Sequence, residues 1–336
     1  MKAYVLHGVN DLRYEEIDRP AVPENWALVR VKAAGICSSD VPRICKTGTY
    51  HFPTVPGHEF CGEVAAVGSG SDVALVGKRV GVFPLIPCKK CESCRQKKYE
   101  TCQNYDYLGS RRDGGFAEYV ACPVWNLIEL PDAVSYTQAA VLEPLAVARH
   151  ALNAAVLSDV KTAAIIGTGA IGLFMAMILR SEGKEVTLVG RSEGKRALAT
   201  RCGIGDYIVG DDGRKFDLTV EAVGSSASLA QSVALARSGG QVVLVGNPAD
   251  ETMSLDKAVY WQILRRQLRV YGTWNSSYEK DAPSDWSEVL RLVSEGKVDP
   301  EKAITHVLSQ ERLYDGLEIM KNKTAVYGRI VVKFNE

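Results

Sequence analysis

Hydrophobic and polar residues alternate through much of the first 150 residues, in short runs separated by glycine and proline. The run "ALVRVKAAGIC" has the period of two that is typical of a strand with one buried face. The runs "EVAAVGSG", "KRVGVFP" and "GGFAEYVACP" have a similar character. This pattern predicts a β-rich, barrel-like region from which one cysteine-rich loop projects.

The hydrophobic pattern changes near Lys161, where short apolar runs begin to alternate with stretches of helical character. "TAAIIG" leads into "AIGLFMAMILRSEGK", "EVTLVG" into "SEGKRALATRCG", and "FDLTVEAVG" into "SASLAQSVALARSGG". Strands that alternate with helices predict crossover units on a doubly wound parallel sheet. A helix in "SDWSEVLRLVSEGKV" and a strand in "GRIVVKF" follow. The fold class expected from the whole pattern is α/β, with a β-rich part and a parallel-sheet part.

Composition narrows the class of protein. The chain has 336 residues, and its 40 basic and 40 acidic side chains give a formal net charge of zero. Nucleic acid is therefore not expected as a partner, because phosphate binding calls for a basic surface.

The uncharged run 162–179 is long enough for a membrane span, but its closely spaced glycines favour a strand, a turn and a helix. No membrane partner is expected. The N-terminal sequence lacks an apolar signal core, so we expect a cytoplasmic protein whose nine cysteines are free thiols or metal ligands.

The segment "IIGTGAIG" has the spacing of a dinucleotide-binding turn. Gly167, Gly169 and Gly172 form the pattern G-x-G-x-x-G after an apolar strand and at the start of a helix. The first glycine permits the tight turn, the second lets the backbone approach a pyrophosphate, and the third lets helix and strand pack closely. The N–H groups at the helix start, where Ala170 and Ile171 lie, would face the anion. A glycine-rich turn in an unrelated α/β protein is the plainer alternative.

The end of the next predicted strand bears on the choice of cofactor. NAD sites usually place an acidic residue there, about 20 residues after the glycines. In this chain Gly190 stands at that place, followed by Arg191 and Ser192, with Lys195 one turn later. Glycine leaves room for a 2′-phosphate that a carboxylate would repel, and a guanidinium can bind it through two hydrogen bonds. The segment favours NADP(H) over NAD(H), although the basic residues could also form only a solvated helix start.

Four cysteines recur within fifteen residues in the spacing C-x2-C-x2-C-x7-C. They are Cys88, Cys91, Cys94 and Cys102. Four thiolates so close together can surround one ion in a tetrahedron, which is typical of structural zinc. The main alternative, an iron–sulfur cluster, has a bacterial run with three residues before its last cysteine and a proline after it. Disulfides are less expected in a cytoplasmic protein.

A second set of candidate ligands is scattered along the chain. It consists of Cys37 in "GICSSD", His58 and Glu59 in "PGHEF", and Glu143 in "VLEPLAV". A catalytic zinc takes about three protein ligands and keeps one position open, and these residue types supply that set. Taken singly, Cys37 could be a small buried hydrophobe and His58 a core histidine with satisfied hydrogen bonds. Sequence spacing does not show whether the four side chains converge.

These motifs together resemble those of the zinc-containing medium-chain alcohol and polyol dehydrogenases. The resemblance covers essentially the whole chain, and "YDYLGSRRDGGFAEY", "LEP" and "GTWNSSY" are similar to the sugar-alcohol branch. It implies a GroES-like catalytic domain over residues 1–150 and a Rossmann cofactor domain over residues 151–285. A C-terminal segment, residues 286–336, is expected to return to the catalytic domain. Members of the family often form dimers or tetramers, so a homo-oligomer is expected.

The resemblance also implies roles for single residues. Cys37 and His58 match ligands of the catalytic zinc, and Glu143 matches the variable third ligand. Glu59 matches the adjacent acid, which ligates directly, through water, or in exchange with substrate. Ser39 matches the hydroxyl that receives the substrate proton. Two further matches are Asp40, the carboxylate that orients the ligating histidine, and the set Cys88, Cys91, Cys94 and Cys102, which holds the structural zinc.

The implied reaction is hydride transfer between a secondary alcohol of a polyol or polyol phosphate and a nicotinamide cofactor. Arg111 and Arg112 are candidates to bind a phosphate or several hydroxyls, or are two arginines on an exposed turn. Trp274 and Asn275 are candidates to line the substrate pocket, although Trp274 could also serve packing. Pro42 stands near the place where some alcohol dehydrogenases have a histidine, so the proton path beyond Ser39 stays open.

Two other functions are compatible with parts of the sequence. The enzyme could oxidise simple secondary alcohols or an amino-acid alcohol. The chain could also be a non-enzymatic module that binds zinc and a nucleotide. The zero net charge and the additional Cys, His and Glu ligands argue against the non-enzymatic module, because a purely structural zinc domain needs no second ligand set.

Overall fold

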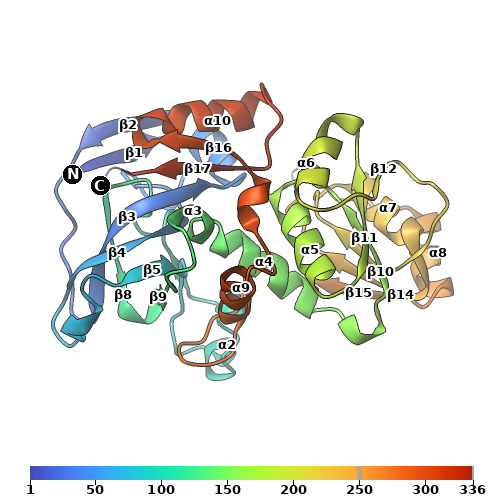
Figure 1. The fold of residues 1–336 in the computed structure, drawn as a ribbon, viewed down its shortest axis with the longest axis horizontal. Coiled ribbons are helices and arrows are strands. Elements are labelled where there is room, and N and C mark those ends of the chain that lie inside the picture. The colour runs from blue at the N-terminus through green and yellow to red at the C-terminus, as the bar shows by residue number, and fades with distance from the viewer. Residues whose placement is uncertain (249–251, 335–336) are drawn as a thin grey trace. The chain divides into compact units, whose positions relative to one another are not determined.

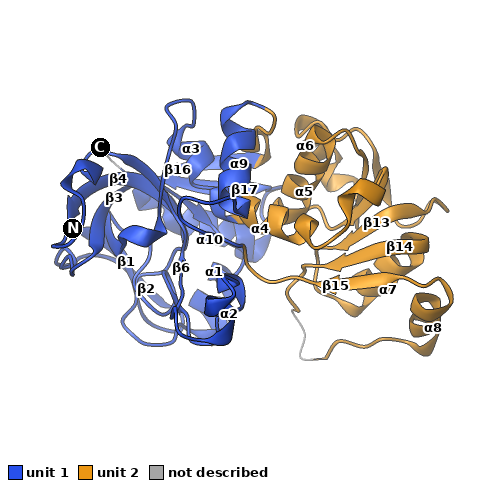
Figure 2. Ribbon diagram, turned by 90° about the horizontal axis from the view of Figure 1, so that it is seen from below, with its two compact units in different colours: residues 1–143, 277–296, 304–336 blue, residues 144–276, 297–303 orange. Residues whose placement is uncertain are grey.

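The structure is a computed structural model that describes residues 1–248 and 252–334. The chain divides into two compact units, which Figures 1 and 2 show. The first unit comprises Met1–Glu143, Ser277–Gly296 and the segment from Ile304 onward, and the second comprises Pro144–Ser276 and Lys297–Ala303. The sequence predicts domain boundaries after residues 150 and 285, whereas the structural units divide after residues 143 and 276.

The first unit is built around a seven-stranded sheet of order β16–β17–β3–β4–β5–β9, in which β8 also pairs with β3. Its strands are β3 (Trp26–Ile36), β4 (Glu59–Val67), β5 (Arg79–Val82), β8 (Tyr119–Pro123), β9 (Leu127–Glu129), β16 (Ile304–Ser309) and β17 (Arg329–Lys333). Two smaller antiparallel pairs join β1 (Lys2–Gly8) with β2 (Asp11–Glu16), and β6 (Leu85–Ile86) with β7 (Asp106–Tyr107). The predicted β-rich part is thus present.

The core of the first unit draws side chains from the N-terminal strands and from the C-terminal segment. Tyr4, Phe60 and Phe116 pack in one buried cluster with Ile330 of β17 and Leu313 of α10 (Leu313–Asn322). Burial of such side chains contributes about 1.5–3 kcal/mol each, which fixes the C-terminal segment in this unit. The other helices of the unit are α1 (Asp40–Pro42), α2 (Glu92–Arg95), α3 (Tyr136–Ala139) and α9 (Asp285–Ser294), and α4 (Leu142–Asn153) begins in it.

The second unit has a six-stranded sheet of order β12–β11–β10–β13–β14–β15, and every neighbouring pair is parallel. Its strands are β10 (Thr162–Ile166), β11 (Glu185–Gly190), β12 (Tyr207–Val209), β13 (Phe216–Glu221), β14 (Ala236–Leu244) and β15 (Arg269–Gly272). Its helices are α5 (Ala170–Ser181), α6 (Arg196–Arg201), α7 (Ser226–Leu235) and α8 (Lys257–Arg265). The predicted doubly wound sheet is confirmed. The order reverses at β10, and ligands of open α/β sheets bind where the order reverses.

The long uncharged run at residues 162–179 forms β10, the glycine turn and most of α5. Its side chains are buried against the sheet, as the sequence predicts for a strand and a core-facing helix. Within residues 1–248 and 252–334, no helix has both the length and the apolar character needed to cross a membrane.

Candidate active site

Cys37 and His58 lie together because two neighbouring antiparallel strands meet at the same end of the sheet. Gly35 of β3 is the register partner of Glu59 of β4. The chain therefore leaves β3 and reaches Cys37 beside the point where His58 leads into β4. The register of β17 on the other edge of β3 brings Arg329 to the same end.

The side chains of Cys37, His58 and Glu59 form a compact group of possible metal ligands. One ligand atom from each lies within 4.8 Å of the others, and His58 Nε2 is 3.9 Å from Glu59 Oε1. Both carboxylate oxygens of Glu59 are buried and have no hydrogen-bond partner among the described residues. Oε2 has Arg329 as an ion-pair partner, which leaves Oε1 as the buried acceptor that a further cation or donor would satisfy. Cysteine sulfur, histidine nitrogen and carboxylate oxygen are the ligand types that zinc binds in proteins, so these residues fit a divalent metal.

Glu143 lies beside this group but is not one of the three residues within 4.8 Å. It lies in the first turn of α4, and its Oε1 accepts a hydrogen bond of 3.2 Å from the hydroxyl of Tyr107. Burial raises the pKa of Glu143 to about 7, although the charge of His58 acts in the opposite direction. The role of Glu143 as a third protein ligand stays a prediction, and Glu59 occupies the nearer position.

Asp40 links the backbone of one candidate ligand to the ring of the other. Its Oδ2 accepts a hydrogen bond of 2.9 Å from the backbone N–H of Cys37, and its Oδ1 is 3.5 Å from His58 Nδ1. Arg43 also donates to Oδ1, at 3.2 Å. Burial raises the pKa of Asp40, but His58 and Arg43 together outweigh burial and lower it. The carboxylate thus faces Nδ1 at ion-pair distance, without a hydrogen bond to it among the described residues, and Nε2 of His58 lies on the side of Glu59.

The electrostatics of the group favour a thiolate at Cys37 and a protonated imidazole at His58. Burial alone would raise the pKa of the Cys37 thiol, but the charge and hydrogen bond of His58 lower it to about 6. For His58, burial alone would lower the pKa, but Asp40 and Cys37 raise it to about 10. A thiolate is the form of cysteine that binds metal, whereas His58 binds metal only after it loses its proton, so metal binding here would release a proton.

Ser39 lies next to the thiolate, at the position where the resemblance implies a proton-accepting hydroxyl. Its Oγ donates a hydrogen bond of 3.3 Å to Cys37 Sγ, and the residue is partly exposed. The hydroxyl can therefore exchange protons while it stays in contact with the ligand group.

Three side chains of the site do not follow from sequence reasoning. Arg329, which is buried, forms an ion pair with Glu59, and Arg43 contacts Asp40. The ring of Tyr107 lies 5.8 Å from that of His58. A signal for Arg329 exists in "GRIVVKF", since an arginine that opens a buried strand requires an acidic partner. The sequence offers no comparable signal for Tyr107 or Arg43.

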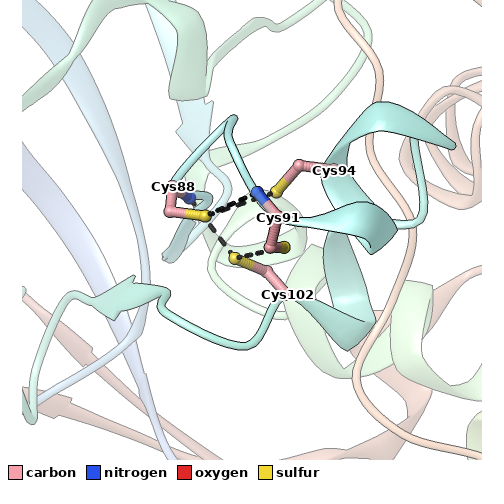
Figure 3. A group of neighbouring side chains, drawn as sticks. All are labelled: Cys88, Cys91, Cys94 and Cys102. Carbon is pink, nitrogen blue, oxygen red and sulfur yellow. Dashed lines mark hydrogen bonds between the residues drawn. The ribbon is translucent and has the colours of Figure 1, made fainter.

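The four clustered cysteines converge, as Figure 3 shows. Their ligand atoms all lie within 4.8 Å of one another, and the distances Cys88 Sγ–Cys94 Sγ and Cys91 Sγ–Cys102 Sγ are 3.9 and 3.8 Å. Sulfurs at about 2.3 Å from a tetrahedral zinc are about 3.8 Å apart, so the four thiols fit a single ion. All nine cysteines of the chain are free, which agrees with the prediction against disulfides.

The loop that carries these cysteines rests on an aromatic cluster of the first unit. Lys89 lies over the ring of Trp125 at 4.8 Å, and Tyr99 packs edge-on against Trp125 at 5.2 Å. Lys97 and Tyr99 both reach the carboxylate of Glu279, at 3.3 and 3.4 Å. The contacts tie the loop to residues near the start of α9, so a metal in the loop would stabilise more than the loop itself.

The predicted dinucleotide turn has the geometry that its three glycines require. Gly167 has a φ of 115°, which L side chains rarely adopt. A Cβ at Gly172 would lie 2.0 Å from the Gly167 carbonyl oxygen, so the helix can approach the turn only with glycine there. Gly169 precedes α5, and a Cβ at Gly169 would meet no atom within 4 Å. The open space at the start of α5, where Ala170 and Ile171 lie, fits a bound pyrophosphate.

Gly190, at the end of β11, lies so close to Tyr207 that a larger residue would collide with it. A Cβ at Gly190 would lie 1.8 Å from the hydroxyl of Tyr207, and this hydroxyl donates to the Ser192 carbonyl oxygen at 2.7 Å. The Tyr207 hydroxyl thus fills the space that a side chain at position 190, where many NAD enzymes carry an acid, would need. Arg191 is exposed, and no ion pair to it is found in the described part of the chain. Lys195 Nζ donates to the carbonyl oxygen of Thr168 in the glycine turn, at 3.2 Å.

The two candidate substrate arginines have different surroundings. Arg112 is exposed, donates to Asp106 Oδ2 at 2.6 Å and lies over the ring of Trp26. The guanidinium of Arg111 instead lies between the rings of Tyr50 and Tyr105. The alternative of an arginine on an exposed turn therefore applies to Arg112, whose guanidinium is already paired with Asp106.

Trp274 and Asn275 follow β15 in the second unit. Trp274 has an exposed fraction of 55%, so its ring does not fill the core of that unit. Asn275 has a φ of 61°, and its Oδ1 accepts a hydrogen bond of 2.9 Å from the N–H of Ser276. A role in substrate binding stays a prediction for both residues.

Comparison with known families agrees with the geometry. The model of the alcohol dehydrogenase GroES-like domain matches residues 23–132, and the model of the zinc-binding dehydrogenase family matches residues 170–295. Galactitol 1-phosphate 5-dehydrogenase of Escherichia coli K12 is 34% identical over 320 residues, which cover 91% of this chain and 92% of that protein. Sorbitol dehydrogenase of Bacillus subtilis is 29% identical over 336 residues, covering 95% of this chain and 93% of that protein.

Solved structures show the same relationship over the full length. The crystal structure of galactitol-1-phosphate dehydrogenase from Escherichia coli has a TM-score of 0.90 at 32% identity, and covers 99% of this chain and 100% of its own. The rspB dehydrogenase of Escherichia coli CFT073, complexed with NADH, has a TM-score of 0.91 at 26% identity, with 99% of both chains covered. A zinc-binding dehydrogenase of Sinorhizobium meliloti 1021 bound to NADP has a TM-score of 0.89 at 28% identity, covering 99% and 98%.

The chain belongs to the zinc-containing medium-chain alcohol and polyol dehydrogenases. The predicted resemblance is confirmed, and so is the combination of a GroES-like domain with a Rossmann-type domain. Membership makes the protein an oxidoreductase, and a non-enzymatic binding module has no support. The solved relatives carry NADH in one case and NADP in another, so the family does not decide the cofactor.

Asp40→Asn tests the orientation of His58. The substitution keeps an acceptor for the Cys37 N–H but removes the charge that holds His58 Nδ1. We expect the affinity for zinc at the Cys37 group to fall about 10- to 100-fold, measured by competition with a chelator. Asp106→Asn, which alters a surface carboxylate paired with Arg112, is the control and should leave the affinity unchanged. Equal zinc affinity in Asp40→Asn and the unmodified protein would contradict the assigned role.

Cys94→Ser tests the metal-binding capacity of the cysteine loop. If the loop holds a zinc ion, we expect the zinc content to fall by about one ion per chain and the Tm to fall by several degrees, because one of the four ligands is removed. Metal analysis and thermal unfolding measure the two effects. Cys122→Ser is the matched control, since Cys122 is buried outside both ligand groups. It should lower the Tm without loss of metal, and loss of metal in neither variant would rule out an ion in the loop.

Proposed function

We propose that the protein is a zinc-dependent dehydrogenase that transfers a hydride between a secondary alcohol of a polyol or polyol phosphate and NADP(H). The observation that carries the proposal is the buried group of Cys37, His58 and Glu59, with Asp40 behind the imidazole, in a chain of the dehydrogenase family. The substrate class is supported by the relatives, whose names refer to galactitol 1-phosphate and sorbitol.

Cys37, His58 and Glu59 would hold the catalytic zinc, with Glu143 as an alternative or exchanging carboxylate. Zinc supplies Lewis acidity, which lowers the pKa of a substrate hydroxyl. The second zinc would be held by the four cysteines of the loop at residues 88–102, which gives about two zinc ions per chain. The Sγ–Sγ distances of 3.8 and 3.9 Å support a single ion there over a larger cluster.

The chain's own residues handle the proton and the geometry. Ser39 accepts the proton of the substrate hydroxyl, because its Oγ lies beside the thiolate and is reachable from solvent. Asp40 faces Nδ1 of His58 at 3.5 Å, so that Nε2 is available as a ligand. Arg329 balances the charge of Glu59, and Tyr107 holds Glu143. The nicotinamide cofactor supplies the hydride acceptor or donor.

The cofactor would bind at the glycine turn of the second unit. Gly167, Gly169 and Gly172 leave space for the pyrophosphate at the start of α5. Arg191 and Ser192, with Lys195 near the turn, provide donors for a 2′-phosphate. A guanidinium with no ion pair in the described residues can bind a phosphate without first losing a partner.

Self-association is supported by the exposed apolar edge of the second unit. β15 is the last strand of its sheet, and its Val270 has an exposed fraction of 40%. Tyr260, Trp261 and Leu264 of α8 are also exposed. Open edge strands and apolar patches of this kind are typical of surfaces that pair between subunits, which favours a dimer or tetramer.

The cytoplasm is the compartment that keeps nine cysteines as free thiols.

A panel of sugar alcohols and their phosphates, assayed with NADP and with NAD, tests the proposed function. We expect oxidation of at least one member, followed by the absorbance of the reduced cofactor. Cys37→Ser should lower kcat by at least about 100-fold without loss of fold, because the thiolate ligand is removed. Cys45→Ser, outside both ligand groups, is the control and should keep its activity. Turnover of simple alcohols or amino-acid alcohols alone would remove the proposed substrate class.

Arg191→Gln tests the preference for NADP. We expect the KM for NADP to rise about tenfold while the KM for NAD changes little, because only NADP carries the 2′-phosphate. Arg196→Gln is the matched control, since Arg196 is already paired with Glu193. A lower KM for NAD than for NADP in the unmodified enzyme would contradict the preference.

A further inference from the structure

Arg111 is held between two aromatic rings in the first unit. Its Cζ lies 4.1 Å from the ring centroid of Tyr50 and 4.6 Å from that of Tyr105. A guanidinium stacks well on aromatic faces, and stacking leaves the N–H groups in its plane free for other partners. The arrangement therefore fixes the orientation of the cation without using its hydrogen bonds.

These hydrogen bonds remain unused within the described chain. The Nε of Arg111 is buried and has no partner, and no carboxylate of the described residues forms an ion pair with this guanidinium. The adjacent Arg112 has the opposite surroundings, because Asp106 accepts its Nε–H at 2.6 Å. A buried donor without a partner is unfavourable, and an anionic ligand would offset this cost.

The backbone connects Arg111 directly to the candidate active site. Arg111 donates its N–H to the Tyr107 carbonyl oxygen at 2.9 Å, so both residues belong to one tight turn. The carbonyl oxygen of Arg111 contacts His51 Nε2 at 3.1 Å, which holds the turn from its other side. The position of the guanidinium is thus set by the same turn that positions Tyr107.

A continuous series of rings links Arg111 to the proposed metal ligands. The ring of Tyr105 lies 6.1 Å from that of Tyr107, and the ring of Tyr107 lies 5.8 Å from that of His58. The Tyr107 hydroxyl donates to Glu143. All these residues belong to the first unit. A substrate that placed its reacting hydroxyl at the ligand group could extend along these rings toward Arg111.

We propose that Arg111 binds the phosphate of a polyol phosphate and selects the phosphorylated substrate over the free polyol. This inference rests on the proposed function and names one of its two substrate classes. A phosphate monoester fits because it accepts two hydrogen bonds from one guanidinium and supplies the negative charge with which the cation would pair. Arg112 has no part in the selection, because Asp106 already occupies it.

The test compares Arg111→Gln and Arg111→Lys with the matched control Arg112→Gln. The kcat/KM of each protein is measured for a polyol phosphate and for the same polyol without phosphate. We expect Arg111→Gln to lower kcat/KM for the phosphorylated substrate about 10- to 100-fold, and for the free polyol by less than about threefold. Arg111→Lys should recover part of the loss, since it restores charge but not the planar fork. Arg112→Gln should behave like the unmodified enzyme.

A binding measurement separates this inference from the proposed function. Inorganic phosphate is titrated into each zinc-loaded protein by calorimetry, with no turnover required. Binding that is weakened in Arg111→Gln and retained in Arg112→Gln would support the phosphate site even if no polyol were oxidised, a result that would overturn only the proposed function. If the ratio of kcat/KM for the polyol phosphate to kcat/KM for the free polyol were the same in Arg111→Gln and in the unmodified enzyme, only the inference about Arg111 would be overturned. A preference for free polyols or for sugar acids in the unmodified enzyme would overturn it as well.

Discussion

The antiparallel pairing of β3 with β4 and β17 is the constraint on which the site depends. The ladder brings the end of β3, the start of β4 and the start of β17 to one place. Cys37, His58 and Arg329 thereby meet although they are distant in sequence. Side chains alternate between the faces of a sheet, so a slip of one residue in either ladder would turn a ligand away from the others.

The same pairing concentrates charge in a buried place, which must be compensated. Asp40, Glu59 and Arg329 are each less than about a tenth exposed, and removal of charges from water costs several kcal/mol for each ion. The compensation is reciprocal: Asp40 faces His58 and Arg43, and Glu59 faces Arg329. The carboxylate oxygens of Glu59 still lack hydrogen bonds in the described chain. A divalent cation would complete the balance, which makes metal binding and the local fold mutually dependent.

Much of the fold and part of the site could be predicted from the sequence, because some constraints are local. The glycine spacing reports contacts within one strand, turn and helix, and the cysteine spacing reports ligands within one short loop. The parallel sheet and the β-rich unit follow from periodicity, and both are confirmed. The convergence of Cys37 and His58 depends instead on the register between strands, which residue spacing alone does not encode; the family resemblance was needed to connect them.

The side chains that sequence reasoning missed or could not separate depend on contacts across the fold. Tyr107 contacts His58 and Glu143 only because its turn packs against both. Arg111 and Arg112 are neighbours of the same type, and the sequence gives no reason to distinguish them. Their difference arises from the rings of Tyr50 and Tyr105 on one side and from Asp106 on the other.

The contact between Gly190 and Tyr207 restricts how coenzyme use could change during evolution. An aspartate at position 190 would collide with the tyrosine hydroxyl, because even a Cβ there would lie 1.8 Å from it. Removal of Tyr207 first would open a void beside the strand and break its hydrogen bond to the Ser192 carbonyl oxygen. Each single replacement is thus unfavourable alone, whereas a smaller residue at position 207 would leave the space that an aspartate at position 190 needs. The two positions are epistatic, so a lineage with this tyrosine would pass through a weakened ancestor before it gained an acidic ribose-binding residue.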